Sequence, residues 1–181
     1  MVGCPNIFKA GGYYFACEDR NLFRATSPNG PWTTLHDQFS IVAAGLNPNG
    51  ACNFNYRDAV KVGGKTYFAI SHEFSLAERR TRIIWSPDDG VTIPDTNIVY
   101  DGLASDVPAA LQLVAAGGHV VGYCGTSVLT SADGFSVAHP TGLTYDGFPG
   151  RKIAAVGDYA YIIGTGGTSG DKCVVFDPAT Q

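Results

Sequence analysis

Paired carboxyl groups are the clearest candidate for chemistry in this chain. Hydrolysis of a glycosidic bond uses two carboxyl groups that face each other across the bond, about 5 to 9.5 Å apart. Asp58 is the first candidate, and Glu73 or Glu18 could supply the second group. The spacing in the sequence leaves open which of the two would face Asp58.

The residues around Asp58 form a candidate ligand site. Tyr56 and Arg57 precede Asp58 directly, and His72 lies close to Glu73 in the sequence. Together Tyr56, Arg57, Asp58 and His72 could bind a ligand, with Arg57 and His72 assisting the carboxyl group. The alternative is structural, with Asp58 capping the end of a strand and pairing with Arg57 at the surface.

No metal or other cofactor is predicted. The chain has four histidines without ligand spacing, and its five cysteines contain no C-x-x-C pair. Three cysteines lie in apolar runs and are interpreted as small buried side chains: Cys17, Cys124 and Cys173. Reduced thiols are typical of a protein that folds in a cytoplasm.

Composition narrows the classes of partner. The 181-residue chain carries a net charge of −4 with 12 dispersed Lys and Arg residues, which argues against nucleic acid as a partner. No apolar run reaches the roughly 18 residues of a membrane span. The first residues, 1–5, show no export signal, so we expect a protein made in the cytoplasm.

The elements that must position these residues repeat along the chain. Runs typical of β-strands follow Gly11, Gly63, Gly117 and Gly157, at intervals of about 40 to 55 residues. This period predicts an all-β, propeller-like single domain over 1–181 with about four antiparallel blades. The predicted units are 4–40, 55–101, 108–146 and 150–181.

The second unit shows the pattern in most detail. Its predicted strands are 59–62, 65–70, 82–85 and 97–100, and Gly63-Gly64 supplies the positive φ of a two-residue hairpin. Asp58 would then begin the innermost strand and project toward a central channel. Residues 40–55 and 71–81 are predicted loops, which are either binding loops or neutral insertions.

The last unit contains three predicted strands, so its sheet would have an open edge. An open edge is a template for pairing with another chain. We therefore expect protein partners there, either further copies of this chain or components of a larger assembly.

Three predicted turns resemble the Asp-box, or BNR, repeat, whose pattern is Ser-x-Asp-x-Gly-x-Thr-Trp. The best match is Ser86-Pro87-Asp88-Asp89-Gly90-Val91-Thr92, with Ile93 in place of Trp. The matching positions of the three turns are Ser27, Asn29 and Gly30; Ser86, Asp88 and Gly90; Ser131, Asp133 and Gly134. The resemblance implies a sialidase-like propeller in which these turns are structural and lie away from any catalytic centre.

The first unit also resembles blades of five-bladed glycoside hydrolases that act on arabinan, xylan or fructan. Those families carry an early Asp-Pro pair, where this chain has Cys4-Pro5, so the group at the expected nucleophile or base position is missing. Asp58 in Arg57-Asp58-Ala59 is the nearest match to their Arg-Asp-Pro motif.

These observations favour a non-catalytic module for binding or assembly. Short Asp-box proteins of this kind resemble bacteriophage tail or capsid appendages, which implies a virion location and either a surface glycan or other virion chains as partners. The alternative is a sialidase- or arabinanase-like glycoside hydrolase that uses Asp58.

Overall fold

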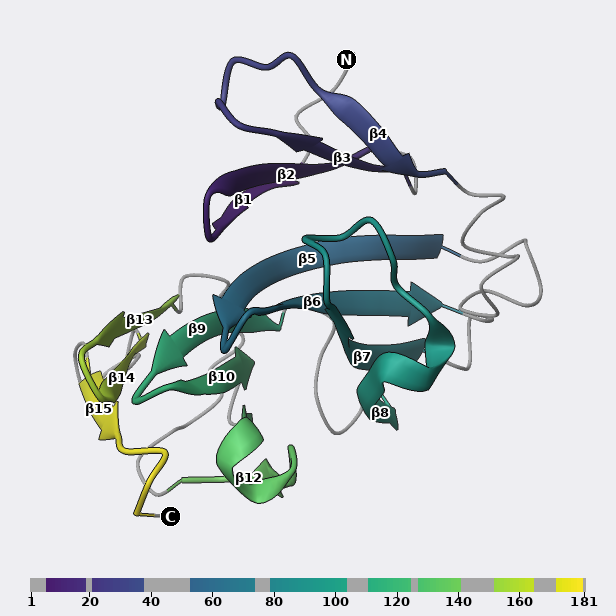
Figure 1. Cartoon of the computed structure of the whole chain (residues 1–181). Coiled ribbons are helices and arrows are strands. Elements are labelled where there is room, and N and C mark those ends of the chain that lie inside the picture. The colour runs from purple at the N-terminus through teal and green to yellow at the C-terminus, as the bar shows by residue number, and fades with distance from the viewer. Residues whose placement is uncertain are drawn as a thin grey trace.

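The computed structural model of the chain describes residues 6–18, 21–37, 53–73, 79–103, 111–124, 127–140, 152–164 and 172–180. These residues form four antiparallel sheets and no α-helix, which confirms the all-β class (Figure 1). Two 3-10 turns occur, η1 (Asp95–Asn97) and η2 (Ser131–Asp133). Within the described ranges, no helix is long and apolar enough to cross a membrane.

The first two sheets have four strands each, in sequence order. The first contains β1 (Asn6–Ala10), β2 (Tyr13–Glu18), β3 (Asn21–Ala25) and β4 (Thr33–His36). The second contains β5 (Asn53–Val62), β6 (Lys65–Glu73), β7 (Arg79–Ser86) and β8 (Ile98–Leu103).

The other two sheets follow the same order. The third contains β9 (Gln112–Ala116), β10 (His119–Cys124), β11 (Ser127–Thr130) and β12 (Val137–Ala138). The fourth contains β13 (Lys152–Val156), β14 (Tyr159–Gly164) and β15 (Lys172–Phe176). In the described residues, β15 is therefore an edge strand that pairs with β14.

Glycine turns join the first two strands of each sheet. The predicted positive φ of the hairpin between β5 and β6 is confirmed, since φ is 56° at Gly63 and 81° at Gly64. Residues with a Cβ adopt this left-handed conformation at a cost, which explains the glycines.

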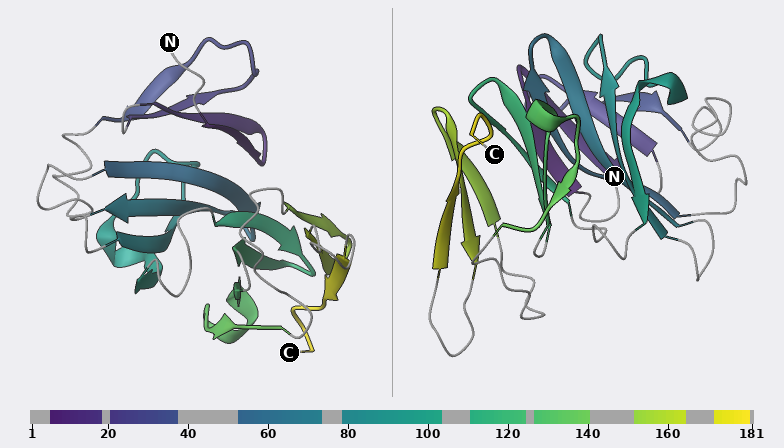
Figure 2. Two further views of the ribbon diagram at one scale, coloured as in Figure 1. Left: turned by 180° about the vertical axis from the view of Figure 1, so that it is seen from behind. Right: turned by 90° about the horizontal axis from the view of Figure 1, so that it is seen from below.

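The sheets pack face to face with their first strands side by side. β1 lies against β5, β5 against β9, and β9 against β13. The sheets fan out from this row of strands (Figure 1), and Figure 2 shows them from two further sides. Each inner sheet therefore packs on the preceding sheet with one face and on the following sheet with the other.

Apolar side chains fill the three spaces between successive sheets. Between the first two sheets, the rings of Phe15 and Phe68 meet edge to face, with 5.2 Å between their centroids. Ile83 of β7 and Leu113 of β9 belong to the cluster between the second and third sheets. Burial of such side chains contributes about 1.5 to 3 kcal/mol each, so packing between the sheets stabilises the fold.

Two predicted boundaries in the second sheet are wrong. β5 begins at Asn53 rather than at residue 59, so Asp58 lies inside a strand and not at its start. His72 and Glu73 belong to β6 rather than to a loop, and Glu73 pairs with Asn53 on one side and Arg79 on the other. Backbone pairing satisfies the N–H and C=O groups of these polar residues, and this outweighs the preference of their side chains for a loop.

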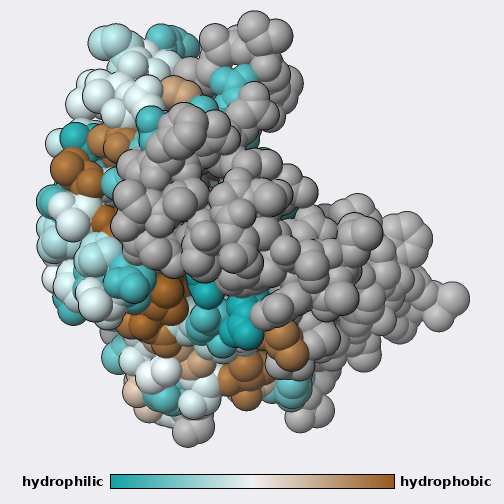
Figure 3. Space-filling view, turned by 90° about the vertical axis from the view of Figure 1, so that its right-hand side faces the viewer, coloured by the Kyte–Doolittle hydropathy of each residue, from teal (hydrophilic) through white to brown (hydrophobic). Residues whose placement is uncertain are grey.

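The described surface carries apolar residues in separate groups on the side seen in Figure 3. Large exposed apolar side chains of the fourth sheet are Val156, Tyr159, Ile163 and Val175. Cys173 is also exposed, so its predicted burial is wrong, whereas Cys17 is buried as predicted. Cys173 pairs with Ile163 on a face of the fourth sheet that no described sheet covers.

Candidate functional site

Asp58 links the second sheet to the third. A β-bulge between Tyr56 and Asp58 leaves Arg57 as the extra residue of β5. One carboxylate oxygen of Asp58, Oδ1, accepts a 2.8 Å hydrogen bond from the backbone N–H of Ala59. The other, Oδ2, accepts a 2.8 Å hydrogen bond from the N–H of Leu113 in β9 of the third sheet.

Burial changes the acidity of Asp58. Desolvation raises the pKa of its carboxyl group above the ordinary value, and the hydrogen bonds from Leu113 and Ala59 oppose this rise. A raised pKa suits a general acid. Both carboxylate oxygens are nevertheless engaged by backbone N–H groups, so the side chain is committed to holding two sheets together.

The other two residues of the Tyr56-Arg57-Asp58 segment point to different surroundings. Tyr56 is 0% exposed and packs against the ring of Phe68 in the core between the first two sheets. Its burial raises the pKa of the hydroxyl well above the ordinary value. Arg57 is exposed, and its Nε donates a 2.7 Å hydrogen bond to Ser71 Oγ.

The strand register separates Glu73 from Asp58. Asp58 pairs with Ala69 of β6, and Glu73 follows Ala69 by four positions, about 13 Å along the strand. His72 lies next to Glu73 in the same strand, opposite Phe54. Glu18 ends β2 in the first sheet, opposite Asn21.

The turn after β7 is held by a set of side-chain hydrogen bonds. Ser86 Oγ accepts hydrogen bonds from the N–H groups of Asp88 at 3.3 Å and Gly90 at 2.8 Å, and it donates to Asp88 Oδ1 at 2.8 Å. Asp88 accepts from the N–H of Thr92 at 2.8 Å and from its hydroxyl at 2.6 Å. The Asp88 side chain therefore acts as a clip that joins the two ends of the turn.

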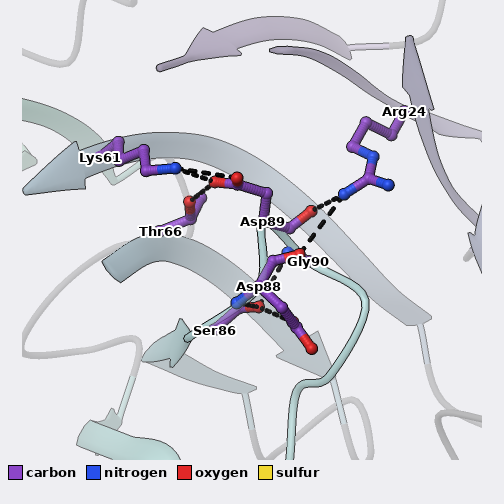
Figure 4. Close-up of polar contacts among 7 residues, drawn as sticks. All are labelled: Arg24, Lys61, Thr66, Ser86, Asp88, Asp89 and Gly90. Atoms are coloured by element: carbon purple, nitrogen blue, oxygen red, sulfur yellow. Dashed lines mark hydrogen bonds and ion pairs between the residues drawn. The ribbon is translucent and has the colours of Figure 1, made fainter. Parts of the chain in front are cut away.

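Asp89 ties this turn to the strands of its own sheet (Figure 4). Lys61 Nζ lies 2.7 and 2.8 Å from the two carboxylate oxygens, and Thr66 Oγ1 donates a 2.7 Å hydrogen bond to Oδ1. Burial alone would raise the pKa of Asp89, but these hydrogen bonds and the positive charges of Lys61 and Arg24 outweigh it and lower the pKa.

Two side chains of the first sheet form hydrogen bonds with the same turn. Arg24 Nη1 donates to the carbonyl oxygens of Asp89 at 2.9 Å and Asp88 at 3.4 Å (Figure 4). His36 Nε2 lies 2.6 Å from the carbonyl oxygen of Gly90, so Nε2 carries a hydrogen in this contact. The turn is thus a junction between the first and second sheets.

Sequence reasoning missed the partners of this junction. The residue type was a signal for Asp89, because Asp is one of the few residues with a Cβ that adopt the left-handed region. In the structure, φ at Asp89 is 56°. For Arg24, Lys61 and His36 the sequence offers no comparable signal, because their partners lie in a different strand or sheet.

The other two predicted Asp-box turns differ in detail. In the first, Ser27 Oγ accepts from the N–H of Asn29 at 3.3 Å, the same contact that Ser86 makes with Asp88. Gly30 has a φ of 84°, comparable with 86° at Gly90.

In the third turn the position of the hydroxyl shifts by one residue. Thr130 Oγ1, rather than Ser131 Oγ, accepts from the N–H two residues later, that of Ala132. Ser131 Oγ accepts instead from the N–H of Val120. Asp133 Oδ1 accepts from Ser136, and Gly134 has a φ of 74°. Counted from Thr130, Gly134 occupies the place of Gly90.

The described side chains show no group of three or more His, Cys, Asp or Glu residues that could hold a metal ion. Comparison with known proteins finds no matching family model and no matching curated protein.

Proposed function

We propose that this chain is a non-catalytic, β-propeller-like module that assembles with other protein chains. The proposal depends on the hydrogen bonds that the Asp58 side chain makes. Both of its carboxylate oxygens accept backbone hydrogen bonds, one from the second sheet and one from Leu113. The group best placed for acid-base chemistry thus stabilises the packing of two sheets.

The propeller-like arrangement is supported by the order of the sheets. Four antiparallel sheets follow one another with their first strands adjacent, as blades around an axis do. The bonding within the 86–92 turn also suits an Asp-box, whose role in such folds is structural. The resemblance to Asp-box proteins of phage tails or capsids makes a virion the proposed setting.

The proposed partners are other protein chains at the fourth sheet. In the described residues, β15 pairs on one side only, and an edge strand of this kind can add a strand from another chain. A surface glycan is the second ligand class that the resemblance implies. The exposed Arg57 beside Asp58 is the observation that favours it.

The alternative, a glycoside hydrolase, is favoured by the raised pKa of Asp58. The two proposals differ in what replacement of Asp58 does. In the scaffold, Asp58→Asn places an amide N–H₂ group against one of two backbone donors, and we expect a loss of about 1 to 3 kcal/mol in the free energy of unfolding.

The experiment combines stability with a search for activity. Wild type, Asp58→Asn and the surface control Asp95→Asn are compared by urea unfolding and by incubation with arabinan, xylan, fructan and sialylated glycans. We expect no sugar release by any of the three and a lower midpoint for Asp58→Asn alone. Sugar release by the wild type that is lost in a folded Asp58→Asn variant would overturn the proposal.

A further inference from the structure

The outward face of the fourth sheet is apolar and uncovered in the described structure. Val156 is 67% exposed, Tyr159 44%, Ile163 48% and Val175 55%. Their register puts these side chains on one face of the sheet. Tyr159, Tyr161 and Ile163 alternate along β14 and so point to the same side. Val156 pairs with Tyr159, and Val175 pairs with Tyr161. The opposite face packs on the third sheet through Ala160, Ile162 and Phe176.

In the other sheets the corresponding face is covered by the next sheet. Tyr161 and Ile163 are the third and fifth residues after their hairpin turn. The residues at these places in β2 are Phe15 and Cys17, which are 0% and 6% exposed against the second sheet. In β10 they are Val121 and Tyr123, which are 0% and 2% exposed against the fourth sheet.

No described sheet covers the corresponding opposite face of the first sheet. Ile7 is 52% exposed and Phe23 is partly exposed on this face, whereas Ala16, which lies between them in the register, is buried. By distance from the hairpin turn and by register, Ile7 corresponds to Ile153, and Phe23 to Val174. Both residues of the fourth sheet pack against the third. In the first sheet, the face that contains Ile7 and Phe23 therefore corresponds to the face with which each later sheet packs on the sheet before it.

We infer that the outward face of the fourth sheet binds the outward face of the first sheet of a second copy of this chain, head to tail. The chain uses this pairing three times internally, always joining these two unlike faces. The contact between copies continues that interface and covers both exposed apolar faces. The inference rests on the proposed function, because it names the partner in assembly.

Charge complementarity supports the same partner. The methylene stem of Lys61 lies against the hairpin turn of the preceding sheet, since a Cβ at Gly11 would lie 2.7 Å from Lys61 Cδ, while its Nζ pairs with Asp89 of its own sheet. Lys9 occupies the place of Lys61 in the first sheet, two residues before its turn. Packed on the fourth sheet of another copy, Lys9 would meet the turn that contains the exposed Asp158.

Joining unlike faces yields rings or open chains, and each copy uses both faces. This predicts complementation between variants. Ile7→Lys blocks the first-sheet face, Ile163→Lys blocks the fourth-sheet face, and Leu103→Lys replaces a 46% exposed residue of β8 outside both faces as the control. Sedimentation velocity over a range of concentrations measures the mass of each.

We expect the wild type and Leu103→Lys to exceed the 19.1 kDa monomer mass increasingly with concentration. Ile7→Lys and Ile163→Lys should each associate at least tenfold more weakly. An equimolar mixture of the two should form dimers and nothing larger, because one intact face of each kind remains. Near-native unfolding midpoints establish that the variants are folded.

Charge reversal provides a second pair that perturbs packing less. Lys9→Glu and Asp158→Lys should each weaken association, and their mixture should restore it. A wild type that stays monomeric would overturn the inference, as would undiminished self-association of Ile7→Lys, which would indicate pairing of like faces or of β15 edges. A monomer without sugar release would overturn only this inference and leave the non-catalytic module in place.

Discussion

Arg24 and Asp89 are 65 residues apart in the sequence, and Arg24 Nη1 donates a 2.9 Å hydrogen bond to the carbonyl oxygen of Asp89. The contact joins β3 of the first sheet to the turn after β7 of the second. The Asp89 side chain turns the other way, toward Lys61 and Thr66. One residue thus connects two sheets through its backbone and two strands through its side chain.

Replacement of Asp89 by Asn should destabilise the protein. Asn accepts a positive φ, so the variant removes the negative charge that pairs with Lys61 while the turn keeps its conformation. Lys61 and Asp89 side chains are 32% and 19% exposed, and we expect a loss of about 1 to 2 kcal/mol. Urea unfolding measures it, and a loss no larger than that of the exposed Asp95→Asn would contradict the structural role of the pair.

Gly90→Ala should destabilise the protein more than Gly64→Ala. Both glycines have positive φ, 86° and 81°, so the backbone strain of about 1 to 2 kcal/mol is shared. A Cβ at Gly64 meets open space, whereas at Gly90 it would lie 3.1 to 3.2 Å from Leu35, Phe68 and Phe15.

Overpacking at Gly90 should add about 1 to 3 kcal/mol to the loss measured for Gly64→Ala. The difference between the two midpoints in urea isolates this packing contribution. Equal losses of unfolding free energy in the two variants would show that the side chains around Gly90 move to accommodate a methyl group at little cost.

Acidification should weaken the protein through His36. Burial lowers the pKa of His36 below 6.5, although the hydrogen bond to Gly90 and the charge of Asp88 oppose this. The folded state therefore favours neutral His36, and its contribution is complete above pH 6.5 and declines as the pH falls below that value. We expect a lower urea midpoint at pH 5.5 than at pH 7.5.

The variant His36→Gln separates this effect from other titrations. Its midpoint should change less between the two pH values than that of the wild type. Asp58 acts in the opposite direction, because its raised pKa contributes stability that is present below the ordinary carboxyl pKa and lost as the pH rises. An equal pH dependence in wild type and His36→Gln would exclude His36 as the titrating group.

Local features of the sequence determined the order of strands and turns. The glycine pairs required positive φ, as at Gly63-Gly64, and alternating apolar residues identified the strands between them. The four sheets and the clip made by Asp88 follow from these local rules, since their hydrogen bonds join residues close in the chain. The start of β5 and the strand at His72 did not, because pairing with neighbouring strands decided them.

Only the tertiary structure decided what the polar side chains do. Asp58 meets the N–H of Leu113, 55 residues later, and Arg24 meets the turn at Asp89. Such partners depend on how sheets stack, which no local pattern encodes. The same holds for Cys173, whose apolar surroundings in the sequence indicated burial. Its exposure follows from its position on the one face of its sheet that no described sheet covers.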